Sequence, residues 1–99
     1  MKTTLYIFGD EVTIDGKIVG DLIAFGRVIR LNGTVEGDFI AAGQAIVIEG
    51  QVTDAARIAG QVLKIVDGAT IGGDVISAGF SLEMTRDTSI GGDLWYGGY

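Results

Sequence analysis

Apolar and polar residues alternate along the chain in short runs that are separated by glycines. In the stretch EVTIDGKIVGDLIAFG, apolar side chains stand at Val12, Ile14, Ile18, Leu22 and Ala24, with polar residues or glycines between most of them. A period of two is typical of β-strands, and the 3.6-residue period of an amphipathic helix is absent. The pattern therefore predicts an all-β chain of short strands that are joined by tight corners.

This pattern repeats over the whole chain: GDLIAFG at 20–26 returns as GDFIAAG at 37–43. The glycines that close such phrases are Gly9, Gly26, Gly43, Gly60, Gly79 and Gly98, with spacings of 17, 17, 17, 19 and 19 residues. Self-similarity of this kind indicates a stacked-repeat fold. Three short strands and three corners fit into one unit. We therefore predict a single domain over 1–99, a triangular parallel β-helix of about 5 to 6 coils of 17–19 residues.

Stacked coils would align equivalent residues in columns, because neighbouring strands lie about 4.8 Å apart. Four columns contain only apolar residues and are predicted to fill the interior. They are Val12, Ile29, Ile46, Leu63 and Leu82; Ile14, Leu31, Ile48, Ile65 and Met84; Ile18, Val35, Val52, Ile71 and Ile90; and Leu22, Phe39, Ala56, Val75 and Leu94. A shift of one residue would expose all four columns, so the register is well specified.

The corners are expected to hold the glycines, because glycine accepts positive φ. The second column of glycines comprises Gly16, Gly33, Gly50 and Gly68. The two longer units are expected to carry their extra residues near Asp67 and near Arg86 and Asp87, at corners where a bulge disturbs the sheets least.

The third strand of each unit is apolar on both faces. Asp21 shares parity with Ile23 and Phe25, so Leu22 and Ala24 are predicted to point inward. An outer apolar stripe is then expected, formed by Ile23, Phe25, Ile40 and Ile76, with Ala42 beside it and with Arg57 and Trp95 in the isoleucine column. Two interpretations remain open: a tolerant surface with ordinary β-propensity, or a contact surface for another chain, a capping segment or a membrane.

A column of acidic residues runs along one edge of the predicted solenoid. Its members are Asp21, Asp38, Asp74 and Asp93, and Ala55 interrupts it. Each carboxylate would accept hydrogen bonds from backbone N–H groups at a corner, as in Asx turns. The alternative is that a divalent cation or carbohydrate hydroxyl groups bridge the column. The interruption at Ala55 favours the first explanation.

Composition narrows the classes of function. Seven Lys and Arg against 13 Asp and Glu give a net charge of −6, which repels phosphate backbones and argues against a nucleic-acid partner. The absence of His argues against the His-dependent acyltransferases and zinc sites of other β-helices. We expect no enzymatic activity and no cofactor.

No apolar run reaches the ~18 residues of a membrane span, and the N-terminus lacks a secretory signal pattern. The expected location is cytoplasmic or membrane-associated, through segments outside this chain.

The iterated phrase V-x-I-x-G-x-V-x-G-D resembles the bactofilin family of polymer-forming bacterial cytoskeletal proteins. The matching segments are VTIDGKIVGDLIA, VIRLNGTVEGDFIA, IVIEGQVTDAARIAG and ATIGGDVISAG. The resemblance implies a right-handed parallel β-helix that assembles end to end without nucleotide. The phrases AAG and SAG look more like a related branch, in which such coils form one domain of an envelope or membrane-anchored protein. The bare end LWYGGY favours a fragment of a longer chain.

The two ends of the predicted solenoid are sheet edges with unpaired backbone groups. We expect self-association there, through Leu5, Tyr6, Ile7 and Phe8 at one end and Leu94, Trp95 and Tyr96 at the other. The predicted function is a non-enzymatic structural protein that forms a homo-oligomer or filament, polar or non-polar according to which ends meet. The alternative is a binding domain of an envelope or membrane-associated protein that is monomeric in isolation and uses the outer stripe or the Asp edge.

Overall fold

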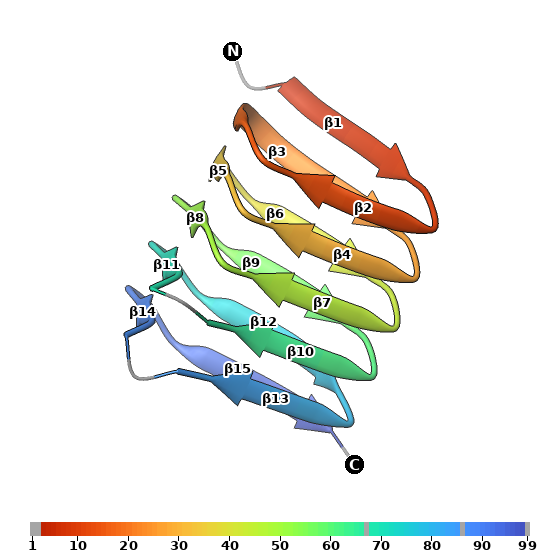
Figure 1. Cartoon of the computed structure of the whole chain (residues 1–99). Helices are drawn as coiled ribbons and strands as arrows, with labels where there is room; N and C mark the ends of the chain where they lie inside the picture. Colours follow the sequence, from red (N-terminus) through yellow and green to blue (C-terminus); the bar gives the residue numbers. More distant parts are fainter. Residues whose placement is uncertain (1–2, 67, 86, 99) are drawn as a thin grey trace.

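The chain folds as a β-solenoid of about five turns (Figure 1), seen in a computed structural model that describes residues 3–66, 68–85 and 87–98. Within these ranges all regular structure is β-strand, and every strand pairs in parallel with its equivalent on an adjacent coil. In Figure 1 the nearer strands run leftward and the more distant strands run rightward as the coils descend, which is a right-handed winding. The predicted all-β, triangular solenoid is confirmed.

Each coil contributes strands to three faces, and β3 (Lys17–Phe25) bends around one corner to serve two of them. The first face holds the second half of β3 together with β1 (Thr3–Phe8), β6 (Phe39–Ala42), β9 (Ala56–Ala59), β12 (Val75–Gly79) and β15 (Leu94–Gly98). This is the face with the longest strands and the most apolar outer side.

The second face lies in front in Figure 1. It is built from β2 (Glu11–Ile14), β4 (Val28–Leu31), β7 (Ala45–Ile48), β10 (Val62–Ile65) and β13 (Ser81–Met84). The third face is narrower. It combines the first half of β3 with β5 (Thr34–Glu36), β8 (Gln51–Val52), β11 (Thr70–Ile71) and β14 (Ser89–Ile90).

The strand registers align the apolar columns as predicted. Val12 pairs with Ile29, and Leu63 pairs with both Ile46 and Leu82, so one column runs unbroken through the second face. Side chains in the middle coils are fully buried, whereas Leu82, Met84 and Ile90 on the last coil are only partly buried. The interior is therefore a stack of aliphatic layers, closed at its sides by the sheets and covered less well toward its ends.

At most corners glycine is needed because a Cβ would collide with the preceding coil, and not because the backbone has a positive φ. Positive φ occurs at Gly20 (120°) and Gly68 (77°), whereas Gly33 is demanded by space. A Cβ on Gly33 would lie 1.9 Å from the carbonyl oxygen of Gly16 on the preceding coil. Glycine at this corner therefore lets successive backbones stack at one strand spacing, and the predicted reason, positive φ, is wrong there.

The two longer coils carry their extra residues at the same corner, between the second and third faces. There the N–H of Ala69 donates to the carbonyl of Val66 at 3.3 Å, and the N–H of Thr88 donates to that of Thr85 at 3.3 Å. Asp67 and Arg86 themselves lie outside the described residues. Because both extensions fall at one corner on adjacent coils, they leave the stacking of the three faces in register.

Candidate functional site

The N-terminal rim begins with β1, which pairs in register with β3 over six residues. Leu5 lies over Leu22 and Ile7 over Ala24, so both continue columns that point into the solenoid. Leu22 is fully buried, but Leu5 is 42% exposed because no described strand covers it. Ile7 is half-buried and packs against the core. Two interior columns thus reach this rim uncovered.

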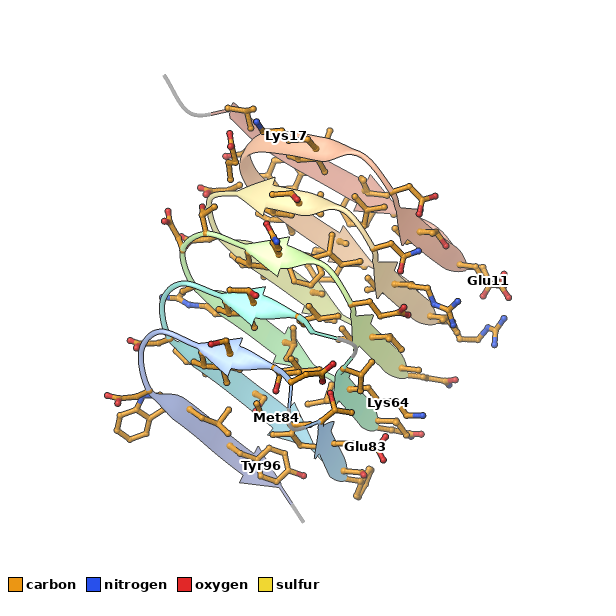
Figure 2. The ribbon with its side chains drawn as sticks, turned by 60° about the vertical axis from the view of Figure 1, so that its left-hand side comes forward. Glu11, Lys17, Lys64, Glu83, Met84 and Tyr96 are labelled. Carbon is orange, nitrogen blue, oxygen red and sulfur yellow. The ribbon has the colours of Figure 1, made fainter. Side chains whose placement is uncertain are left out.

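The C-terminal rim mirrors this arrangement. Leu94 lies under Val75 in the same inward column, yet Leu94 is 43% exposed and Val75 is 0% exposed. Tyr96 follows Ser77 in the next inward column, and its hydroxyl group donates to the carbonyl of Gly79 at 3.0 Å. Figure 2 shows Tyr96 and Met84 on the last coil, where the interior opens. This rim also exposes side chains of interior parity.

The seven residues predicted for the ends divide into two groups. Leu5, Ile7, Leu94 and Tyr96 have interior parity, whereas the other three share parity with the outer stripe and point away from the core. Those three are Tyr6, Phe8 and Trp95, and all are exposed. Phe8 stacks on Phe25 with ring centroids 5.3 Å apart. The rims and the outer stripe therefore meet on the first face rather than forming separate surfaces.

The outer stripe exists where the parity of Asp21 placed it. Tyr6 pairs with Ile23, Ile23 with Ile40, and Ile76 with Trp95, so these side chains form one outer column. Ile23 and Ile40 are half-buried by their neighbours, and Phe25 and Ile76 are more exposed. The predicted outward orientation of the stripe is confirmed, and the column that these side chains form runs along the solenoid axis.

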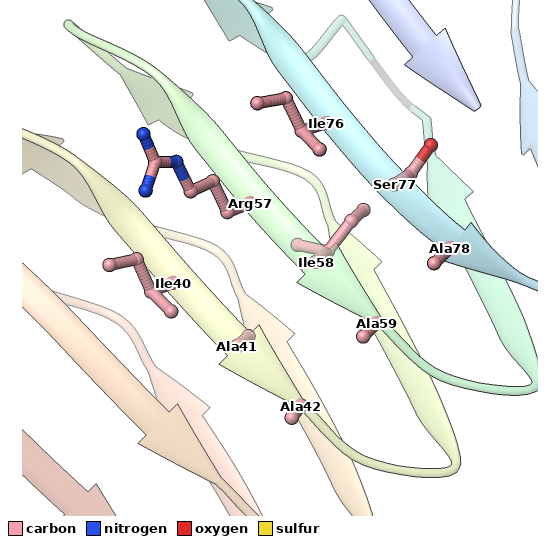
Figure 3. A pocket seen from close by; sticks show the side chains of 9 residues that line it. All are labelled: Ile40, Ala41, Ala42, Arg57, Ile58, Ala59, Ile76, Ser77 and Ala78. Carbon is pink, nitrogen blue, oxygen red and sulfur yellow. The ribbon is translucent and has the colours of Figure 1, made fainter. Parts of the chain in front are cut away.

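A shallow groove of about 290 Å³ lies on this stripe, across β6, β9 and β12 (Figure 3). Ile40, Arg57 and Ile76 form one row along it. A second row of small side chains runs beside the first and consists of Ala42, Ala59 and Ala78. Three consecutive alanines in one column leave a trough, because the neighbouring column carries much larger side chains.

Arg57 is the only charged residue among those that line the groove. Among residues 3–66, 68–85 and 87–98, its guanidinium forms no ion pair and no hydrogen bond. The position two residues before it is Ala55, where the equivalent position of the neighbouring coils is an aspartate. Arg57 is therefore an exposed cation with apolar neighbours on both sides of its column and no counter-ion within the described chain.

The acidic column at the start of these strands binds backbone groups of the solenoid itself. Oδ1 of Asp21 accepts the N–H of Asp38 at 2.9 Å, and Oδ1 of Asp38 accepts the N–H of Ala55 at 3.0 Å. Asp74 accepts the N–H of Asp93 in the same way at 2.8 Å. The prediction of backbone N–H donors at a corner is confirmed, but each donor lies on the following coil rather than within a local Asx turn.

Ion pairs lie on the outer side of the second face and at its corners. Arg27 donates from Nε to Oδ1 of Asp10 at 2.9 Å and from its terminal nitrogen to Oδ2 at 3.2 Å. The hydrogen bonds and the positive charge of Arg27 lower the pKa of Asp10 below its ordinary value. Lys64 pairs with Glu83 on the next coil at 3.8 Å, and Figure 2 shows both on the outer side. The second face is therefore charged where the first face is apolar.

The stripe was predicted from the sequence, including Arg57 in its isoleucine column, but the groove on it was not. The signal was present in the spacing, since Ala42, Ala59 and Ala78 follow Ile40, Arg57 and Ile76 by two residues in each coil. Reading the outer columns together, rather than one at a time, would have revealed a row of small residues beside a row of large ones. The exposed Val62 on the second face was also not singled out.

Among the described residues there is no group of three or more acidic, His or Cys side chains placed to hold a metal ion. In the same part of the chain no helix is long and apolar enough to cross a membrane. No protein-family model, no curated protein and no solved structure matches the chain.

Proposed function

We propose that the chain is a non-enzymatic structural module that self-associates through the rims of its solenoid. The observation that carries this proposal is the contrast in exposed fraction between neighbouring side chains of the same interior column. Leu5 and Leu94 are 42% and 43% exposed, although their in-column neighbours Leu22 and Val75 are completely buried. Covering such side chains is favourable by about 25 cal/mol for each Å² of apolar surface removed from water.

The backbone at the rims supports the same proposal. Strands β1 and β15 pair with one described neighbour each, so the other edge of each strand offers free N–H and C=O groups. A partner that satisfies these groups and also covers the interior columns must present three short strands around an apolar centre. A second copy of this chain has a rim of that shape and chemistry, which makes it the occupant we propose.

Sedimentation velocity and negative-stain electron microscopy of the purified chain test this proposal. Wild-type protein is expected to form oligomers or filaments that grow with concentration. Leu5→Glu and Leu94→Glu should disperse them, since each places a charge in the contact. Val62→Glu is the matched control: Val62 is 40% exposed but lies on the outer side of the second face, so this variant should assemble like the wild type.

Two results would contradict self-association through the rims. Dispersed wild-type monomers at all concentrations would favour the alternative, a monomeric binding domain that uses its first face. Assembly that survives both rim substitutions but is lost in Val62→Glu would place self-association on the side of the solenoid instead.

A further inference from the structure

Side chains in the groove on the first face repeat at a spacing close to that of side chains along one face of an α-helix. Ile40, Arg57 and Ile76 follow one another at one strand spacing, about 4.8 Å, in the order apolar, cationic, apolar (Figure 3). On an α-helix, side chains three or four residues apart lie about 5–6 Å from each other along one face. A helix lying along the solenoid axis could therefore place one side chain opposite each member of this row.

The small residues beside the row would allow such a helix to come close. Ala42, Ala59 and Ala78 carry only methyl groups, so a ridge of larger side chains on the helix can enter the trough that they form. A partner that covers the central position of the row must offer an anion to Arg57, because this guanidinium has no counter-ion among the described residues and would otherwise lose its hydration without compensation. An acidic side chain one helical turn from an apolar residue on each side would satisfy all three positions.

Two other occupants fit less well. A small amphiphile would be poorly enclosed, since this trough is open and its volume of about 290 Å³ is at the lower end for small-molecule sites, which bury most of their ligand. A second copy packed symmetrically on the centre of the groove would bring two Arg57 side chains together, and like charges in such a contact are unfavourable.

We infer that this groove binds an amphipathic helix of a partner protein, with one glutamate or aspartate in its apolar stripe facing Arg57. This mode of recognition is a helix in a groove, with anchors one turn apart. It uses the side of the solenoid, so it does not depend on association through the rims and is compatible with both a monomer and a filament.

A synthetic peptide of about 18 residues, which is about 27 Å of helix, is a suitable probe. Its apolar stripe is leucine except for one central glutamate, and two matched peptides carry glutamine or lysine at that position. Binding is measured by calorimetry and by the fluorescence of Trp95, the chain's single tryptophan. The glutamate peptide should bind the wild-type chain at least about fivefold more tightly than the lysine peptide, as expected for attraction replaced by repulsion at a partly exposed pair.

A charge exchange makes the test specific to Arg57. Arg57→Glu should reverse the order, so that the lysine peptide binds more tightly, and Arg30→Glu on the second face should leave the order unchanged. Ala59→Phe, which fills the trough, should weaken all three peptides alike. Circular dichroism confirms that each variant is folded; if Arg57→Glu is not, Arg57→Gln should abolish the preference for glutamate.

The inference is wrong if none of the peptides binds, if the three bind equally, or if Arg57→Glu keeps the preference for glutamate. It is also wrong if wild-type protein forms a symmetric dimer through this face that the glutamate peptide does not displace. Because the rim variant Leu94→Glu retains the groove, repeating the titration with it separates a failure of this inference from a failure of self-association.

Discussion

The carboxylate of Asp38 accepts a hydrogen bond from the backbone N–H of Ala55, 17 residues later in the chain and one coil further along the axis. The same bond links Asp21 to Asp38 and Asp74 to Asp93. These bonds connect successive coils at a corner where the sheet ladder is interrupted. The acidic column therefore has a structural function that requires no bound cation.

Removing one of these carboxylates should destabilise the solenoid. Asp38→Ala leaves the part-buried N–H of Ala55 without its acceptor, and we expect a loss of about 1–2 kcal/mol in the free energy of unfolding, measured in urea. Asp38→Asn keeps a side-chain oxygen and should lose less. Asp93, in the same column but with no hydrogen bond to its carboxylate among the described residues, is the control, and Asp93→Ala should change stability by less than about 0.5 kcal/mol. Equal losses at both positions would contradict this role of the column.

The corner glycines offer a second matched pair. A Cβ on Gly33 would collide with the carbonyl oxygen of Gly16, whereas nothing lies within 4 Å of a Cβ on Gly16 itself. Gly33→Ala should therefore cost about 1–3 kcal/mol, as for other overpacked sites. Gly16→Ala should stay within about 1 kcal/mol of the wild type. Thermal unfolding of the two variants compares them, and a tolerated Gly33→Ala would mean that the coils stack less closely than described.

The two faces of the sheets can be distinguished with one substitution on each. Ile48→Glu buries a charge without a partner in the interior and should prevent folding. Ile40→Glu places the same charge on the half-buried outer side of the first face, where the chain should remain folded while binding through the groove is lost. Far-ultraviolet circular dichroism reports the fold of both variants. A folded Ile48→Glu beside an unfolded Ile40→Glu would reverse the assignment of inner and outer columns.

The ion pair between Asp10 and Arg27 gives a pH dependence with a definite sign. Arg27 lowers the pKa of Asp10, through hydrogen bonds first and charge second, below its ordinary value of 3.8. A lowered folded-state pKa contributes stability above the unfolded-state pKa, and this contribution is lost as the pH falls through the folded-state value. Both side chains are exposed, so the effect on stability should be small. Carboxyl NMR titration should show the Asp10 pKa rising toward its ordinary value in Arg27→Gln; an unchanged titration would contradict the pairing.

Much of the fold follows from the sequence because each coil repeats the same alternation of apolar and polar residues. Val12, Ile29 and Ile46 recur at 17-residue spacing, and burying them together fixes both the strand register and the inner face. The outward orientation of Ile40 and Ile76 follows from the same parity. Residue types and spacing thus determine the solenoid, its core and its outer stripe.

The contacts between neighbouring coils depend on how closely the coils approach each other. The spacing of residues along the sequence does not give this distance. The collision that makes Gly33 necessary arises from a carbonyl group on the preceding coil. The donors to Asp21 and Asp38 likewise come from the following coil, and the groove requires two neighbouring columns of different size. These are contacts between repeats, whereas a single repeat shows only its own alternation.

Amide hydrogen exchange at increasing protein concentration tests self-association through the rims most directly. If the rims pair with second copies, amides on the free edges of β1 and β15 should exchange more slowly as the concentration rises, while the amides of β6, β7 and β9 in the middle coils stay unchanged. Exchange at the two end strands that is independent of concentration would contradict the proposal, as would new protection confined to the outer side of the middle coils.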